Sequence, residues 1–162
     1  MIIRTARDTD LFELAAIEAE CFPPGKAASL ETIEKRLKFY PRHFLLLIED
    51  GKIVSFINGF VTDQEDLTDE MYSSPRMHRE SGRWQMVFGV DTLPAYRRKG
   101  YASILMRQFI SEARRQGRTG LVLTCLEEKI HFYERFGFED EGISSSEHGG
   151  VSWHQMRLVL KH

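Results

Sequence analysis

The chain has 162 residues, of which 42% are hydrophobic and 28% are charged, and its net charge is -2. This length and composition predict one domain with a sizeable core, residues 1–162, and the charge excludes the strongly basic surface that would attract nucleic acid or an anionic membrane. The cysteines, Cys21 and Cys125, stand in apolar contexts without metal-ligand spacing, which argues against a disulfide framework or a structural zinc.

The beginning of the chain, MIIRTARDTD, lacks the apolar core of a signal peptide. No uncharged run approaches the length that spans a bilayer. We therefore expect a cytoplasmic protein.

In the first half of the chain, the hydrophobic pattern predicts a strand over residues 1–5, helices over 8–22 and 30–40, and strands over 43–50 and 52–62. Leu11, Leu14 and Ile17 share one face of the first helix, and Ser29 is placed to cap the second. The dipeptide Asp50-Gly51 tolerates positive φ, so it suits a tight turn between the two antiparallel strands.

The second half is predicted to open with a long polar loop, residues 63–82, of the kind that often covers a ligand and with room for a short helix. A strand, a helix, a strand, a helix and a last strand follow, over residues 83–92, 100–116, 120–126, 127–138 and 151–160. The order of elements predicts an α+β fold with a mixed, mostly antiparallel central sheet flanked by about four helices.

Three consecutive cations, Arg97, Arg98 and Lys99, precede the helix that begins near Gly100. A helix N-terminus exposes unpaired N–H groups, and Gly100 with the small Ala102 would let a phosphate approach the backbone closely. The turn is therefore a candidate diphosphate site, and the alternative is an ordinary solvated loop. Rossmann and Walker glycine patterns are absent, which argues against dinucleotide or triphosphate binding.

The pattern Arg-x-x-Gly-x-Ala over Arg97–Ala102, preceded by FGVDTLPAY, resembles the coenzyme A pyrophosphate loop of GNAT superfamily N-acetyltransferases. A second stretch, IHFYERFGF, resembles the segment after the fifth strand of that superfamily, and the order of elements fits nearly the whole chain. Within the superfamily the chain is similar to arylalkylamine (serotonin) N-acetyltransferases and their bacterial relatives through CFP, FINGF, LTDEMY, FYERFGF and SSEHGGVSWHQM.

The resemblance implies an acetyltransferase that uses acetyl-CoA as cosubstrate. It assigns the pantetheine arm to the backbone of Phe88, Gly89 and Val90, as a peptide-like ligand adds to a strand edge. It assigns the diphosphate to the amides of Arg98, Lys99, Gly100, Tyr101, Ala102 and Ser103. It also makes Tyr133 the candidate general acid that protonates the departing thiolate, whereas helical spacing alone would make Tyr133 a core aromatic.

The general base is not identified by the resemblance. Vertebrate arylalkylamine acetyltransferases carry two histidines on the strand before the loop, and their positions here are Trp84 and Met86, or Met86 and Phe88 in a second register. A water chain is one substitute, and the candidates by residue type are His78, His131, His148 and His154.

Two other chemistries are disfavoured by the residue pattern. The histidines have no ligand-like spacing and no H-E-x-x-H is present, so we expect no metal. Cys125 has the context of a buried strand residue rather than an acylated nucleophile. We therefore expect direct transfer from the thioester to the amine.

The expected acceptor is a small primary amine that resembles an arylalkylamine. Acidic residues in the stretch 63–70 could attract a cationic substrate. The aromatic residues expected near the acceptor are Phe22, Phe56, Phe60 and Trp153. Of these, Phe56 and Phe60 are favoured as core residues. A polyamine, an aminoglycoside or a protein N-terminus are alternative acceptors, and a coenzyme A sensor without turnover is an alternative function.

A nucleic-acid module, suggested by the basic stretch 112–118, is disfavoured by the net charge. No motif addresses the oligomeric state.

Overall fold

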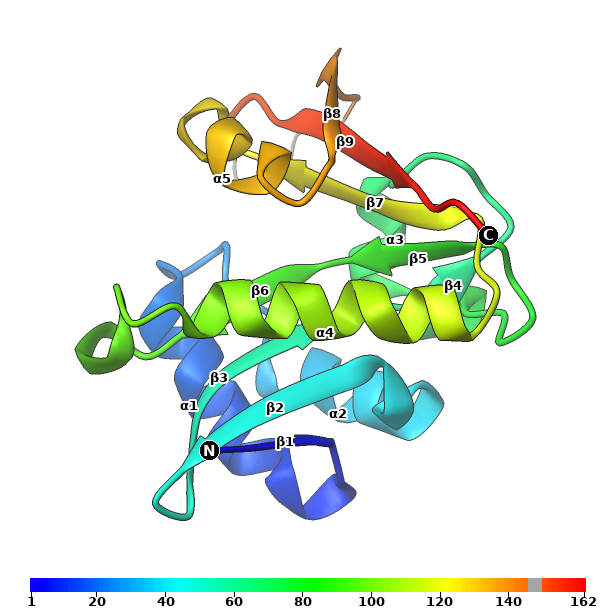
Figure 1. Ribbon diagram of the computed structural model, residues 1–162. Helices are drawn as coiled ribbons and strands as arrows, with labels where there is room; N and C mark the ends of the chain where they lie inside the picture. Colours follow the sequence, from blue (N-terminus) through cyan, green and yellow to red (C-terminus); the bar gives the residue numbers. More distant parts are fainter. Residues whose placement is uncertain (146–149) are drawn as a thin grey trace. The chain divides into compact units, whose positions relative to one another are not determined.

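A computed structural model describes residues 1–145 and 150–162, so the candidate base His148 lies outside the described residues. The chain forms two compact units: the first comprises residues 1–59 and 89–109, and the second comprises residues 60–88 and 110–162. Each unit contains one β-sheet (Figure 1). Helices and mostly antiparallel strands confirm the predicted α+β class.

The sheet of the first unit has four strands in the order β1-β2-β3-β6, and every neighbouring pair is antiparallel (Figure 1). The strands are β1 (Ile2–Thr5), β2 (Phe44–Glu49), β3 (Lys52–Asn58) and β6 (Gly89–Thr92). The predicted turn between β2 and β3 is confirmed, with positive φ at Asp50 (48°) and Gly51 (76°). Among the described residues β6 pairs with β3 alone, so it is an edge strand of this sheet.

Two helices of the first unit follow the predicted periodicity. Helix α1 (Leu11–Cys21), which follows the short 3-10 turn η1 (Asp8–Asp10), buries Leu14 and Ile17 and packs against β3 and β6. Helix α2 (Leu30–Phe39) begins at the predicted cap, where Ser29 Oγ accepts a hydrogen bond from Thr32 N at 3.1 Å. A second 3-10 turn, η2 (Pro41–His43), leads into β2.

The sheet of the second unit has five strands in the order β4-β5-β7-β9-β8, with β5 and β7 parallel and the other pairs antiparallel. The strands are β4 (Val61–Thr62), β5 (Trp84–Val87), β7 (Gly120–Cys125), β8 (Glu139–Ile143) and β9 (His154–Val159). The loop 63–82 contains a short helix, as predicted, α3 (Asp69–Ser73), followed by η3 (Pro75–Met77). After β7, the turn η5 (Glu127–Lys129) leads into α5 (Ile130–Glu134).

The prediction of one continuous strand over residues 83–92 was wrong. The strand is interrupted at Phe88, so that β5 joins β7 in the second unit while β6 joins β3 in the first. The Phe88 ring packs against the rings of Phe60 and Tyr72, each with its centroid 5.0 Å away. An apolar run has the same appearance whether it pairs with one neighbour or with two, so the sequence alone does not reveal the interruption.

Helix α4 (Tyr101–Arg115) is the longest helix and connects the two units through the chain itself. Its predicted range, residues 100–116, agrees within one residue at each end. Within the described residues, each helix is too short or too polar to cross a bilayer.

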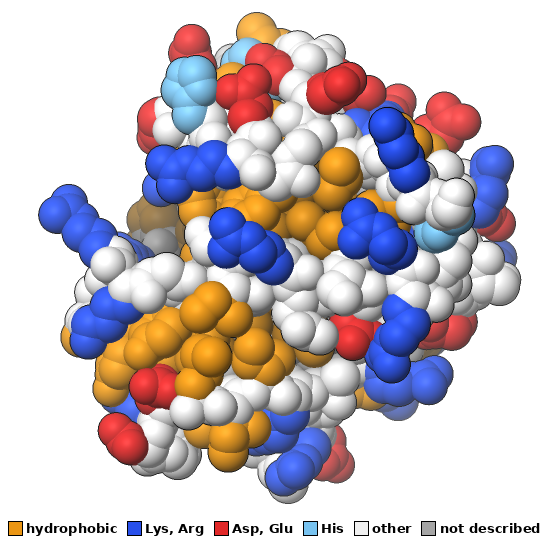
Figure 2. Space-filling view, viewed as in Figure 1, with side chains coloured by type: hydrophobic (Ala, Val, Ile, Leu, Met, Phe, Trp, Pro, Cys, Tyr) orange, Lys and Arg blue, Asp and Glu red, His pale blue; other side chains and the backbone are white. Residues whose placement is uncertain are grey.

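Two arginines of the basic stretch 112–118 form contacts within the chain. Arg118 is only 6% exposed, and its guanidinium donates to the carbonyl oxygens of Glu80 (2.6 Å) and Gly82 (2.8 Å) and to the Glu80 carboxylate (3.0 Å). Arg115 forms an ion pair with Glu112. On the face drawn in Figure 2, Lys and Arg side chains are interspersed with acidic, apolar and other side chains.

Replacing Arg118 with Met should destabilise the protein by about 3–5 kcal/mol, because the carbonyls of Glu80 and Gly82 lose their buried donor. Urea unfolding followed by circular dichroism measures this loss. Arg114, an exposed residue near the end of α4, supplies the matched control Arg114→Met. Equal stability of the two variants would contradict a structural role for Arg118.

Candidate active site

The loop between β6 and α4 has the backbone expected of an anion site. After the 3-10 turn η4 (Pro94–Tyr96), φ is positive at Arg98 (64°) and at Gly100 (83°). Left-handed residues of this kind aim neighbouring N–H groups into a common concavity that suits an anion. A Cβ placed on Gly100 would meet no atom within 4 Å, so the space beside this residue is open.

Several side chains hold the loop in place. Arg97 Nε donates to Thr92 O at 3.1 Å, Lys99 Nζ lies 5.3 Å from the centre of the Tyr96 ring, and Tyr101 Oη donates to Glu49 Oε2 at 3.2 Å. Arg98 is exposed and has no ion-pair partner among the residues that the structure describes. The Arg98 cation is therefore available to a bound anion.

The first turn of α4 follows directly. Ile104 N donates to Gly100 O at 3.0 Å, so the amides of Tyr101, Ala102 and Ser103 precede the first intrahelical bond. The predicted diphosphate residues, Arg98–Ser103, are thus brought together at the N-terminus of a 15-residue helix.

Val90 presents its backbone at the open edge of β6. Leu93 N donates to Val54 O at 2.9 Å, and the register continues through Asp91–Phe56 and Gly89–Asn58. Because hydrogen-bonded and outward-facing residues alternate along an antiparallel strand, the N–H and C=O groups of Val90 point away from β3. An edge with free backbone groups is what an extended amide ligand requires.

Tyr133 and Phe88 belong to the second unit, whereas Gly89, Val90 and the loop belong to the first. Tyr133 lies on α5 and is half-buried. Its ring packs against Phe132 (centroids 5.0 Å apart) and Phe138 (6.1 Å). These contacts fix the ring, and the assignment of Tyr133 as the general acid stays a prediction.

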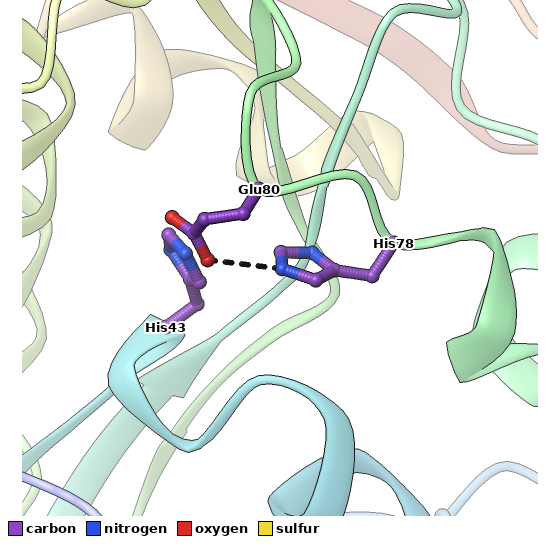
Figure 3. A group of neighbouring side chains, drawn as sticks. All are labelled: His43, His78 and Glu80. Atoms are coloured by element: carbon purple, nitrogen blue, oxygen red, sulfur yellow. Dashed lines mark hydrogen bonds and ion pairs between the residues drawn. The ribbon is translucent and has the colours of Figure 1, made fainter.

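His78 has both ring nitrogens in use. Val61 N donates to Nδ1 at 3.1 Å, which requires that nitrogen to be unprotonated, and Nε2 lies 3.1 Å from Glu80 Oε1. Figure 3 shows the contact of His78 with Glu80. Accepting a further proton at Nδ1 would break the bond from Val61, so this histidine is a poor general base.

The other described histidine candidates each contact a carboxylate, and Cys125 is buried. His131 is exposed and contacts Glu134 on its own helix, and His154 Nδ1 lies 3.1 Å from Asp140 Oδ1. Burial raises the pKa of the Cys125 thiol to about 11, and its Sγ lies 3.5 Å from Met156 Sδ. A thiol that is protonated at neutral pH is not a nucleophile, which agrees with the expectation of direct transfer.

The positions of the family's strand histidines are occupied by apolar side chains. Trp84 and Met86 are buried in β5, and the Arg157 guanidinium lies 4.7 Å from the centre of the Trp84 ring. Phe88 is held between two aromatic rings, as described above. In neither register does this strand supply a proton acceptor.

The predicted acceptor residues divide into core and surface. Phe56 and Phe60 are fully buried, as favoured from the sequence, while Phe22 and Trp153 are partly exposed. In the acidic stretch 63–70, several carboxylates have partners: Asp66 pairs with Arg157 at 2.7 Å and Asp63 with Arg83 at 3.8 Å. These pairs reduce the charge that the stretch offers to a cationic substrate.

A buried acidic pair in the first unit was missed by the sequence reasoning. Asp91 on β6 is 1% exposed and Glu18 on α1 is 7% exposed. The signal for Asp91 was a single carboxyl group within the apolar strand FGVDT, two residues from Gly89. A buried carboxyl group next to a second buried carboxyl group is uncommon enough to indicate a site.

The comparison with protein families identifies the chain as an acyltransferase. The model of the acetyltransferase (GNAT) family matches residues 11–138. The chain therefore belongs to the GNAT family, as the resemblance implied.

One relative in sequence is the serotonin N-acetyltransferase of Mesocricetus auratus, which is 28% identical over 91% of this chain and 80% of its own length. Among solved structures, a GNAT-like decarboxylase in complex with isobutyryl-CoA has a TM-score of 0.86, with 22% identity over 99% of this chain and 100% of that one. The ribosomal-protein-S18-alanine N-acetyltransferase of Escherichia coli has a TM-score of 0.76, with 20% identity over 99% and 94%. These two structures support the fold alone.

Proposed function

We propose that the whole chain, residues 1–162, acts as one acyl-CoA N-acyltransferase domain that transfers acetyl from acetyl-CoA to a small, arylalkylamine-like primary amine. The observation that carries this proposal is the loop before α4, with its left-handed residues, its available Arg98 cation and its open space at Gly100. The similarity to serotonin N-acetyltransferase supports the amine class of the acceptor. Cytoplasmic location and action without nucleic acid or metal remain part of the proposal.

In the proposed reaction the amides of residues 98–103 bind the diphosphate, and the outward groups of Val90 bind the pantetheine arm. The amine nitrogen attacks the thioester carbon, a strand N–H stabilises the oxyanion, and Tyr133 protonates the leaving sulfur. A primary amine is about one part in a thousand neutral at pH 7, which adds roughly 4 kcal/mol to the barrier. Removing its proton is therefore the step that most needs a protein group.

Incubation with acetyl-CoA and a panel of arylalkylamines, polyamines, aminoglycosides and peptides with free N-termini tests the proposal. We expect acceptor-dependent thiol release and a mass increase of one acetyl group, fastest with arylalkylamines. Faster reaction with another class would replace the substrate while keeping the transferase. Tight acetyl-CoA binding without product from any acceptor would favour the coenzyme A sensor.

A further inference from the structure

The carboxyl group of Asp91 is buried without the partners that such a group normally has. No hydrogen bond within 3.5 Å reaches either of its oxygens from the residues that the structure describes. By contrast, Asp10, the other buried aspartate of this unit, forms two hydrogen bonds with Arg4 at 2.8 and 2.9 Å. Buried polar groups are otherwise almost always satisfied, so the exception points to a ligand atom or a proton.

The charges around Asp91 come from the two helices of the unit. On α1, Glu18 is anchored by Ala28 N, which donates to its Oε2 at 2.7 Å, and Cys21 lies nearby with its Sγ 3.3 Å from Thr92 O. Burial, then the interaction with Glu18 and then Cys21 raise the pKa of the Asp91 carboxyl well above its usual value, and Arg36 on α2 opposes them. A carboxyl group whose pKa is raised in this way is a better proton acceptor than an ordinary carboxylate.

The space over Gly89 is lined by this carboxyl group. A Cβ on Gly89 would lie 3.2 Å from Asp91 Oδ1 and 3.9 Å from Asn58 Nδ2. Apart from the two residues next to Gly89 in the chain, no other described residue would have an atom within 4 Å of it. Arg36 Nη1 donates to Asn58 Oδ1 at 3.1 Å, which directs the amide nitrogen of Asn58 toward the same space. Gly89 is partly exposed, so the carboxyl group lies just behind an accessible strand position.

We infer that Asp91 is the proton acceptor for the amine, with the buried Glu18 as a positioning residue. This inference rests on the proposed function. The ionised Asp91 takes a proton from the substrate ammonium, and the freed nitrogen lone pair forms the new C–N bond. The C–S bond breaks, the sulfur receives its proton from Tyr133, and the nitrogen, which became cationic when the C–N bond formed, loses its second proton to solvent. Asp91 then releases its proton to solvent and the Tyr133 phenolate takes one back, so that one proton is released per turnover. An acid on β6 thereby replaces the missing histidines of β5.

The experiment compares wild type with Asp91→Asn, Glu18→Gln and the control Asp10→Asn over a range of pH. Asparagine is isosteric with a protonated aspartate, so Asp91→Asn should fold. Below the pKa of Asp91 the carboxyl group is protonated and inactive, so kcat/KM of wild type should rise with pH through that pKa. Asp91→Asn should abolish this rise and lower kcat by about 100- to 10,000-fold with a cationic amine.

Glu18→Gln keeps an acceptor for Ala28 N but removes a negative charge, so the rise should move to lower pH. With 2,2,2-trifluoroethylamine, which is largely neutral at the assay pH, the loss in Asp91→Asn should be much smaller. Calorimetry should give the same affinity for acetyl-CoA in all four proteins, and Asp10→Asn should keep the wild-type pH profile.

Two results would overturn the inference while leaving the transferase intact. One is an unchanged pH profile in Asp91→Asn, and the other is an equal loss with both kinds of amine, which indicates a structural role. Absence of acceptor-dependent turnover in wild type would instead overturn the proposed function and the role of Asp91 together. The two failures are therefore distinguishable.

Discussion

Replacing Gly100 with Glu is expected to weaken acetyl-CoA binding by about 100-fold or more. The substitution places a carboxylate in the open space where the diphosphate is proposed to bind, and like charges at close range repel strongly. It also puts a side chain at φ 83°, a conformation that residues other than glycine adopt at a cost of about 1–3 kcal/mol. Isothermal titration calorimetry measures the affinity directly.

Two control variants separate the charge from the backbone strain. Gly51→Glu introduces the same side chain at a similar φ of 76°, also with no atom within 4 Å, but in the turn between β2 and β3. Gly100→Ala introduces strain at the loop without the charge. We expect near-normal affinity for Gly51→Glu and an intermediate loss for Gly100→Ala. Equal affinities for Gly100→Glu and wild type would remove the loop from the site.

The elements that the sequence predicted well are those whose signals are local. The cap at Ser29 and the turn at Asp50-Gly51 depend on residues a few positions apart, and both are found where expected. The start of α4 after the basic turn is of the same kind. Helical periodicity likewise placed Leu14 and Ile17 in the core of α1.

The features that escaped prediction depend on which segments pair in space. The interruption at Phe88 is decided by pairing with β3 on one side and β7 on the other, far away in the sequence. Asp91 meets Glu18 only because α1 packs against β6. No local pattern records either contact, and a single acidic residue in a strand usually indicates an exposed face.

The histidine candidates show the same limit for the site. Residue type and an ordinary pKa near neutrality made four of the six histidines candidate bases. His78 is disfavoured by the bond from Val61 N, a contact 17 residues away in the chain that only the folded structure reveals. The search by residue type considered histidines, whereas the base proposed from the structure is the carboxyl group of Asp91.

Replacing Tyr133 with Phe should lower kcat by about 100- to 10,000-fold while leaving the affinity for acetyl-CoA nearly unchanged. The substitution removes the hydroxyl proton that is proposed to reach the leaving sulfur. It keeps the ring, so the packing against Phe132 and Phe138 and the stability of α5 should be retained. Steady-state thiol release with the best acceptor of the panel measures the effect, and calorimetry measures the binding.

A second tyrosine of the same unit supplies the matched control. Tyr72 Oη lies 3.0 Å from Thr124 Oγ1, so Tyr72→Phe removes a hydroxyl of the same type without touching the proposed acid. If Tyr133 donates the proton, thioesters of more acidic thiols should lose less activity in Tyr133→Phe, because their thiolates leave without protonation. A rate loss independent of the thiol would mean that the Tyr133 hydroxyl orients the thioester rather than protonating the sulfur. An unchanged kcat would assign the ring to packing alone and leave solvent as the source of the proton.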